Sequence, residues 1–192
     1  SYSTGFQNAT AGQAPDSVTG LFLCRGDLSP EVCRICVNFS VNESLNRCPN
    51  EREAVLYYEE CMLRYSHRNI LSIPTIEGEL RFSNDTNVSS NQFERFNSVL
   101  LSTLNEAVVE AARSFRKFDA RKANFTASQT LYELVQCTPD LTTQECLTCL
   151  EKAINQLSTD KIGGSLLIPS CNARFEIYPF YNAVRAQPPP PV

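Results

Sequence analysis

The nine cysteines have the most versatile chemistry in this chain, and six of them follow a repeated spacing. Cys24, Cys33 and Cys36 form the pattern Cys-x8-Cys-x2-Cys, and the same pattern returns 113 positions later at Cys137, Cys146 and Cys149. Thiols at Cys-x2-Cys spacing can bind zinc, exchange disulfides or form structural bridges. A repeat this long indicates two related domains, because solenoid repeats span only ~20–50 residues.

Zinc binding is the first alternative, because the two Cys-x2-Cys pairs could supply the four thiolates of a tetrahedral site. Each pair, however, has a third cysteine nine residues upstream of its first member, and the sequence carries signs of export, described next. We therefore expect structural disulfides, with no metal and no other cofactor. Thiol–disulfide exchange by Cys33 and Cys36 stays an alternative, because a cysteine at a helix N-terminus has a lowered pKa.

Six Asn-x-Ser/Thr sequons predict a glycosylated, secreted chain in an oxidising compartment; their asparagines are Asn8, Asn38, Asn42, Asn84, Asn87 and Asn124. The chain opens with no signal-peptide pattern and has no apolar run of the ~18 residues that a membrane span needs. We therefore expect mature extracellular sequence or a soluble fragment. The net charge of −4, without a basic stripe, argues against a nucleic-acid partner.

The elements that must position the cysteines divide the sequence into four segments: a first unit at 1–70, a linker at 71–91, a second unit at 92–181 and a tail at 182–192. The linker is polar, which predicts exposure. The tail ends in four consecutive prolines, which favour an extended spacer or a frayed terminus.

The second unit opens with apolar residues at spacings of three and four, which predict a long amphipathic helix at 93–114. A strand at 130–137, a helix near 142–156 and strands at 165–168 and 172–178 follow. We predict an α+β fold of two tandem disulfide-stapled modules, each an antiparallel sheet packed on helices.

The first unit shows only the later elements: strands at 17–24, 54–58 and 61–65 and a helix near 30–45. Nothing before Ser17 has helical periodicity, so the opening helix is missing and we expect the chain to be truncated at its start. An apolar face of this unit should then be poorly covered, and we expect it to carry Val18, Leu21, Leu23, Val55 and Tyr57.

The first unit holds five cysteines and the second holds four, so at least one sulfur has no partner in the chain. When the repeats are matched, Cys61 corresponds to Cys171 and Cys48 has no equivalent. The simplest account places the partner of Cys48 in the missing N-terminal segment. We therefore predict an unpaired Cys48 and four bridges: Cys24–Cys33, Cys36–Cys61, Cys137–Cys146 and Cys149–Cys171.

These motifs carry a family resemblance. Leu-Phe-Leu-Cys-Arg-Gly-Asp stands at 21–27, Val-Gln-Cys-Thr-Pro-Asp-Leu at 135–141, and Pro-Ser-Cys-Asn-Ala-Arg-Phe-Glu-Ile-Tyr-Pro-Phe-Tyr at 169–181. Nearly the whole chain resembles the paired extracellular domains of plant cysteine-rich receptor-like kinases. The same ginkbilobin-like, salt-stress/antifungal domain occurs in secreted cysteine-rich repeat proteins and plasmodesmata-located proteins. The resemblance implies a sheet packed on helices and a role in perception or defence at the cell surface.

The resemblance also implies one candidate ligand-binding residue. Ginkbilobin binds mannose through an Asn, an Arg and a Glu, and only the Glu matches cleanly here, as Glu176, five residues beyond Cys171. The Arg position falls near Ser165, which removes an always-charged, multidentate donor. We therefore expect no mannose site of the family's kind, and the simpler expectation for Glu176 is an acid that faces solvent or pairs with Arg174.

Catalysis has little support in the sequence. His67 is the only histidine, and no serine, cysteine and acid cluster around it. Arg25-Gly26-Asp27 spells a cell-adhesion tripeptide, but Gly-Asp is also ordinary turn composition.

We predict a non-enzymatic extracellular recognition module of a receptor-like serine/threonine kinase, acting in plant defence or stress signalling at the plasma membrane. Its partner would be a protein co-receptor, another ectodomain or a glycan, and it would meet the membrane only through a segment beyond Val192. The alternatives are a freely secreted cysteine-rich repeat protein with lectin-like or antifungal activity, and a structural wall or plasmodesmal protein.

Overall fold

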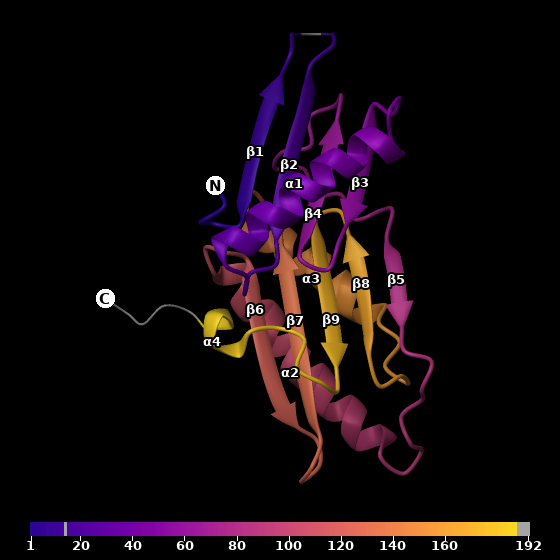
Figure 1. Cartoon of the computed structure of the whole chain (residues 1–192). Helices are drawn as coiled ribbons and strands as arrows, with labels where there is room; N and C mark the ends of the chain where they lie inside the picture. The colour runs from indigo at the N-terminus through magenta and orange to yellow at the C-terminus, as the bar shows by residue number, and fades with distance from the viewer. Residues whose placement is uncertain (14, 188–192) are drawn as a thin grey trace, which may run out of the picture. The chain divides into compact units, whose positions relative to one another are not determined.

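The computed structural model describes residues 1–13 and 15–187, and it divides the chain into two units, Ser1–Ile73 and Pro74–Val192 (Figure 1). The second unit therefore takes over most of the segment at 71–91 that we expected to be a linker. The reason is a short strand at Leu80–Ser83 within that segment, which is hydrogen-bonded into the sheet of the second unit.

The first unit is a four-stranded antiparallel sheet with one helix, α1, on one face (Figure 1). The strand order is β1-β2-β4-β3, and the elements are β1 (Phe6–Ala11), β2 (Val18–Cys24), α1 (Pro30–Arg47), β3 (Glu53–Tyr57) and β4 (Cys61–Ser66). Helix α1 begins where the Ser29 side chain accepts a hydrogen bond from the backbone N–H of Val32, with Pro30 at the first helical position.

Two apolar clusters stabilise the first unit, one on each face of its sheet. Under α1, Phe22 packs with Val37 and with the half-cystines of the two bridges. The opposite face buries Leu21, Leu23 and Met62 with Ile70 from the segment that follows β4. Alternate strand residues point to opposite faces, so Val18 lies on the α1 side while Leu21 and Leu23 lie on the other.

This alternation corrects our expectation of one poorly covered face, which mixed residues from both sides of the sheet. Leu21 and Leu23 are buried, and Val55 and Tyr57 pack against the same cluster. Only Val18, on the helix side, is exposed.

The second unit is a five-stranded antiparallel sheet, and helices α2 and α3 both cover one of its faces (Figure 1). The strand order is β5-β8-β9-β7-β6, and the elements are β5 (Leu80–Ser83), α2 (Phe93–Arg113), β6 (Phe118–Asn124), β7 (Thr130–Cys137), α3 (Thr143–Asn155), β8 (Gly164–Ile168), β9 (Cys171–Glu176) and α4 (Ala183–Ala186).

The two long helices of this unit form for reasons that the sequence displays. Helix α2 buries a stripe from Phe96 to Ala112 against the sheet and α3. Helix α3 begins with a capping box, in which Thr142 and Glu145 satisfy each other's backbone N–H groups.

The two units share one topology, which confirms the predicted α+β fold of tandem modules. The series β1, β2, α1, β3, β4 of the first unit matches β6, β7, α3, β8, β9 of the second in order and pairing. The second unit adds α2, β5 and the short helix α4. The described residues of the first unit contain no counterpart of α2, in agreement with the predicted absence of its opening helix.

Four elements were not predicted from the sequence. Strands β1 and β6 pair with β2 and β7 at the sheet edges, and β5 lies in the expected linker. Helix α4 lies in the expected tail, at Ala183–Ala186, while the four prolines of that tail lie outside the described residues.

Candidate functional site

The repeated cysteines, with Cys61 and Cys171, form four disulfides that join helix α1 to the first sheet and helix α3 to the second. The bonds join Cys24 to Cys33, Cys36 to Cys61, Cys137 to Cys146 and Cys149 to Cys171. In each Cys-x2-Cys pair the two sulfurs belong to different bridges. Neither pair can therefore cycle as an exchange disulfide or offer free thiolates to a metal while these bridges are intact.

Cys48 is the free cysteine of the described residues, and it stands at the C-terminal cap of α1. It is half-buried, and its backbone carbonyl accepts a hydrogen bond of 3.4 Å from the Tyr65 hydroxyl.

The tripeptide Arg25-Gly26-Asp27 forms an ion pair within itself. The Arg25 guanidinium donates to both carboxylate oxygens of Asp27, at 2.7 and 3.2 Å, and also to Glu59 at 3.0 Å. Asp27 is buried. A partner that reads an extended Arg-Gly-Asp loop would find neither charge available, so these residues stabilise a turn.

His67 follows β4 beside a serine and a glutamate, but the three do not form a catalytic arrangement. The Ser66 hydroxyl donates directly to Glu53 at 3.0 Å, and Arg68 pairs with the same carboxylate at 2.7 Å. His67 Nδ1 is buried with no hydrogen-bond partner among the described residues. A base that activates a serine must stand between that serine and the acid.

The outer face of the second sheet is the candidate functional surface. Paired residues of antiparallel strands carry their side chains on the same face, so Phe82 of β5, Ser165 of β8, Arg174 of β9 and Leu134 of β7 form one row. A second row runs parallel to it through Leu80, Leu167, Asn172, Gln136 and Phe118. This outer face lies opposite α2 and α3, because Ala173 and Phe175 pack in the helix-side core.

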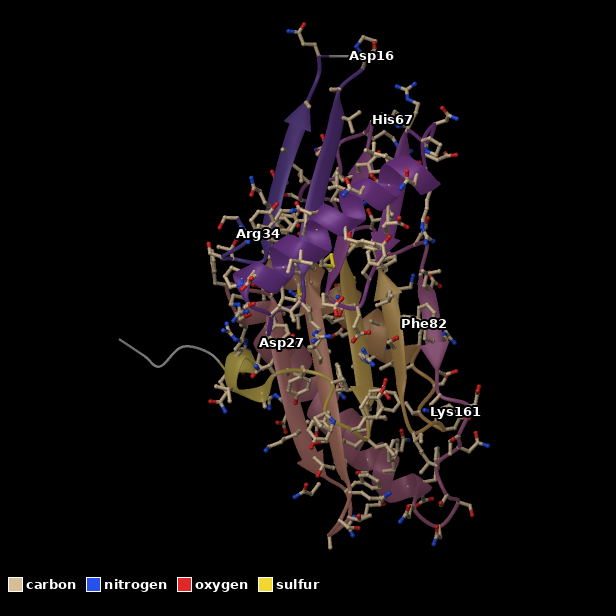
Figure 2. All side chains as sticks on the ribbon, in the orientation of Figure 1. Asp16, Asp27, Arg34, His67, Phe82 and Lys161 are labelled. Atoms are coloured by element: carbon tan, nitrogen blue, oxygen red, sulfur yellow. A yellow bond between two sulfur atoms is a disulfide. The ribbon has the colours of Figure 1, made fainter. Side chains whose placement is uncertain are left out.

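The chain after β9 covers one half of this outer face. Phe180, Tyr181 and Ala186 pack on Phe118 and Leu134, at the β6–β7 side of the sheet. The Tyr181 hydroxyl anchors the segment by donating to the backbone carbonyl of Arg121 at 2.6 Å. On the β5–β8 side, Leu80 and Phe82 are exposed, and Figure 2 labels Phe82 on β5.

We call the uncovered β5–β8 side of the outer face, with Leu80 and Phe82, the bare half. Arg174 stands between the covered half and the bare half, and three groups contact its guanidinium. Its guanidinium donates to Glu176 at 3.1 Å and to the Tyr178 hydroxyl at 3.4 Å, and it lies 4.3 Å from the centre of the Phe180 ring. This cation–π contact and the ion pair fix the orientation of a charged group beside apolar surface.

Glu176, the residue suggested by the resemblance, therefore pairs with Arg174. It is buried, and its second carboxylate oxygen lies against Gly163, where a Cβ would approach within 2.1 Å. A side chain at position 163 would therefore displace the Glu176 carboxylate. Ser165, near which the resemblance places the ginkbilobin arginine, lies directly across from Arg174. The structure brings Glu176 and Ser165 to Arg174, while the sequence analysis missed the row that joins Ser165 to Arg174.

The other buried acid of this unit lies on the opposite, helix-covered side. Glu133 has no exposed surface, and neither of its carboxylate oxygens has a hydrogen-bond partner among the described residues. Burial raises its pKa to about 9; Arg121 lowers it and Glu106 raises it further. Glu133 is therefore a neutral carboxylic acid under α2 at neutral pH, outside the candidate surface.

All six sequon asparagines have exposed side chains, in β1, α1, the segment after β5 and the end of β6. In the described part of the chain, no group of three or more histidine, cysteine or acidic residues is placed to hold a metal ion. None of the helices there is both long and apolar enough to cross a bilayer.

The comparisons with known proteins concern both units. A family model described as salt stress response/antifungal matches residues 1–68 and 81–178. The chain is 59% identical over 197 residues to cysteine-rich receptor-like protein kinase 8 of Arabidopsis thaliana, covering all of this chain and 29% of that protein. It is 60% identical over 195 residues to cysteine-rich receptor-like protein kinase 4 of the same plant, covering 99% of this chain and again 29% of the relative.

Two crystal structures share the fold. The tandem DUF26 ectodomain of the cysteine-rich receptor-like protein PDLP8 of Arabidopsis thaliana matches with a TM-score of 0.75 at 22% identity, covering 92% of this chain and 83% of that one. The tandem DUF26 ectodomain of PDLP5 matches with a TM-score of 0.71 at 24% identity, covering 92% of this chain and 84% of that one. This chain belongs to the salt stress response/antifungal (DUF26) family and carries two copies of its domain, as do the tandem ectodomains of PDLP8 and PDLP5.

Proposed function

We propose that this chain is the extracellular recognition module of a plant receptor-like serine/threonine kinase, which acts in defence or stress signalling by binding a ligand or co-receptor. Relatives at 59–60% identity are named as receptor-like kinases, and the chain spans 29% of their length. In this proposal a membrane segment and the kinase domain follow Val192 in the full-length protein.

Four disulfides and six exposed sequon asparagines support an extracellular location, because both are typical of exported proteins. The disulfides also make each unit rigid, which suits a module that presents a surface and performs no chemistry of its own.

The observation that carries the proposal is the bare half of the outer face. Leu80 and Phe82 are exposed on an edge strand, and Phe82 shares a cross-strand row with Arg174, with Ser165 between them. The Arg174 guanidinium is fixed by Glu176 and Phe180. Aromatic and arginine side chains with little freedom left to lose are the usual centres of protein–protein binding energy. This surface therefore fits a protein co-receptor or a second ectodomain.

The secreted, lectin-like alternative has one observation in its favour: an acid, a guanidinium and aromatic rings lie together at Glu176, Arg174, Tyr178 and Phe180. A sugar would need free hydrogen-bonding positions on the acid. Glu176 is buried, however, and already occupied by Arg174 on one oxygen and crowded by Gly163 on the other. The protein partner is the better supported of the two.

The full-length gene product, expressed in plant cells with an epitope tag in the present chain, tests the proposal. It should sediment with membranes and lose the tag when intact cells are treated with protease. A tag found only in the medium would contradict the receptor proposal and favour the secreted alternative.

Kinase signalling tests the surface. In the full-length protein, Phe82→Ser and Tyr178→Ser, both on or beside the bare half, should reduce stimulus-dependent autophosphorylation while leaving secretion and surface level unchanged. Phe115→Ser is the matched control, because Phe115 is exposed just after α2 and lies outside this face. Equal signalling by all three variants would remove the outer face from the proposal.

A further inference from the structure

Helix α1 carries large apolar side chains on the side that faces away from its sheet. Ile35 is 61% exposed and Phe39 is 51% exposed, and Val32 on the preceding turn is exposed as well. The Phe39 ring is held there by an edge contact with Tyr58, with ring centroids 5.2 Å apart. The apolar stripe is thus a built feature of the surface.

The fold itself does not require this stripe, because the matching helix of the second unit lacks it. At an offset of 113 residues, Val32, Ile35 and Phe39 correspond to Glu145, Thr148 and Lys152 of α3. Among the large apolar residues of α3, none is exposed. The stripe of α1 therefore needs a cover that α3 does not need.

A helix in the position of α2 would cover a different side of α1. Val41 corresponds to Ile154, which is buried in the cluster that α2 and α3 share. Val41 and Phe39 are two residues apart and so point ~160° away from each other around the helix. A helix that packs on Val41 leaves Phe39 and Ile35 in solvent.

Two sequons stand within the same stripe. Ile35, Asn38, Phe39 and Asn42 have the spacing i, i+3, i+4, i+7 of one helix face, and both asparagines are exposed. The corresponding positions in α3 are Glu151 and Asn155, and neither begins a sequon. Exposed apolar side chains and sequons occur together in one helix, and both are missing from its counterpart.

We propose that N-linked glycans on Asn38 and Asn42 cover the apolar stripe of α1 and keep this helix from self-association. In each transfer the asparagine Nδ2 loses one hydrogen and bonds to the anomeric carbon of N-acetylglucosamine, whose bond to a lipid-linked diphosphate donor breaks. The C–H faces of the first sugars then lie over Ile35 and Phe39, while their hydroxyls remain in water. The cover of the stripe is thus encoded in the chain's own sequons and does not depend on which ligand the outer face binds.

The timing of the modification follows from the serines of the two sequons. Ser40 and Ser44 are both buried, and their hydroxyls donate to the backbone carbonyls of Cys36 and Val41 at 2.8 and 2.7 Å. An oligosaccharyltransferase must contact the serine of the sequon, and in the folded helix these serines are buried and out of its reach. The glycans must be added before α1 packs on its sheet.

Glycopeptide mass spectrometry of the chain secreted from plant cells should find Asn38 and Asn42 occupied. In sedimentation velocity, the variant Asn38→Gln/Asn42→Gln should associate and sediment faster than the monomer. The matched control Asn84→Gln/Asn87→Gln, at two other exposed sequons, should stay monomeric. Adding Ile35→Thr and Phe39→Lys, the residues that α3 carries, should restore the monomer without restoring the glycans.

Unmodified Asn38 and Asn42 peptides would overturn the proposal, and so would a monomeric Asn38→Gln/Asn42→Gln variant. If Ile35→Thr/Phe39→Lys does not reverse the association, the surface through which the chains associate lies elsewhere, and the proposal is overturned as well. If the variant is not secreted, enzymatic removal of the glycans from the folded wild-type glycoprotein tests the same point: association after deglycosylation supports the cover, and an unchanged monomer contradicts it.

Discussion

Arg121 and Glu133 face each other across strands β6 and β7, yet they share no hydrogen bond. The Arg121 guanidinium donates instead to Asp119 and Glu106, both at 2.7 Å. Glu133 is left as a buried carboxyl that is stable only when protonated, with a pKa of about 9.

This relationship predicts that the second unit loses stability as pH rises. The folded pKa of Glu133 is raised above the unfolded value of 4.5, so its contribution is fully present below about pH 4.5 and is lost as pH rises through about 9. The slope from this group is up to ~1.4 kcal/mol per pH unit. Glu133→Gln should flatten the slope of unfolding free energy between pH 5 and 9. Glu151→Gln, on the exposed side of α3, should not; equal slopes for both variants would contradict the assignment.

The uneven cover of the two sheets predicts that the first unit is the weaker one. Leu131 of β7 has no exposed surface beneath α2, whereas Val18, its counterpart in β2, is 40% exposed. Leu131→Ala should cost ~2–5 kcal/mol in unfolding free energy, and Val18→Ala should cost less than ~1 kcal/mol. Amide hydrogen exchange should be faster in β2 than in β7. Equal protection of the two strands would show that the first unit does not suffer from the missing helix.

The close approach of Gly163 to Glu176 predicts a coupled pair. Gly163→Ala should destabilise the second unit by ~1–3 kcal/mol, because the new methyl group displaces the carboxylate and with it Arg174. In a double-mutant cycle measured by denaturant unfolding, Glu176→Ala should relieve much of that loss. Additive losses would mean that the glycine is needed for some other reason.

The disulfides should carry much of the stability of these small units. Cys149→Ser/Cys171→Ser should lower the unfolding free energy by ~2–4 kcal/mol, because the bridge restricts the unfolded chain and its loss returns that conformational entropy to the unfolded state. Cys48→Ser, which breaks no bridge, should stay within ~0.5 kcal/mol of wild type. Comparable losses from the two changes would indicate that Cys48 is bonded.

Sequence reasoning found the elements whose own residues carry a strong pattern. The apolar period from Phe96 to Ala111 predicted α2 to within one residue at its C-terminal end, and the cysteine-flanked runs predicted β2 and β7. It missed β1, β5 and β6, which are all edge strands. An edge strand pairs on one side only, so polar sequences such as Phe118–Asn124 are strands because of their neighbours and not because of their own composition.

The candidate surface was missed for a related reason. Glu176 could be singled out by its distance from Cys171, but the row from Phe82 through Ser165 to Arg174 exists only once the register of β5, β8 and β9 is known. The alternation of Asn172, Arg174 and Glu176 with buried apolar residues was the available signal for a polar face. The contact between Gly163, just before β8, and Glu176, at the end of β9, has no signal in the sequence at all.

Disulfide mapping tests the account most directly, because the tandem extracellular module depends on which sulfurs are joined. Non-reducing peptide mapping with free-thiol labelling, on the chain secreted from a eukaryotic host, should find the four bridges described above and label only at Cys48. Labelled Cys33, Cys36, Cys146 and Cys149 with bound zinc would contradict both the extracellular location and the recognition module built on it.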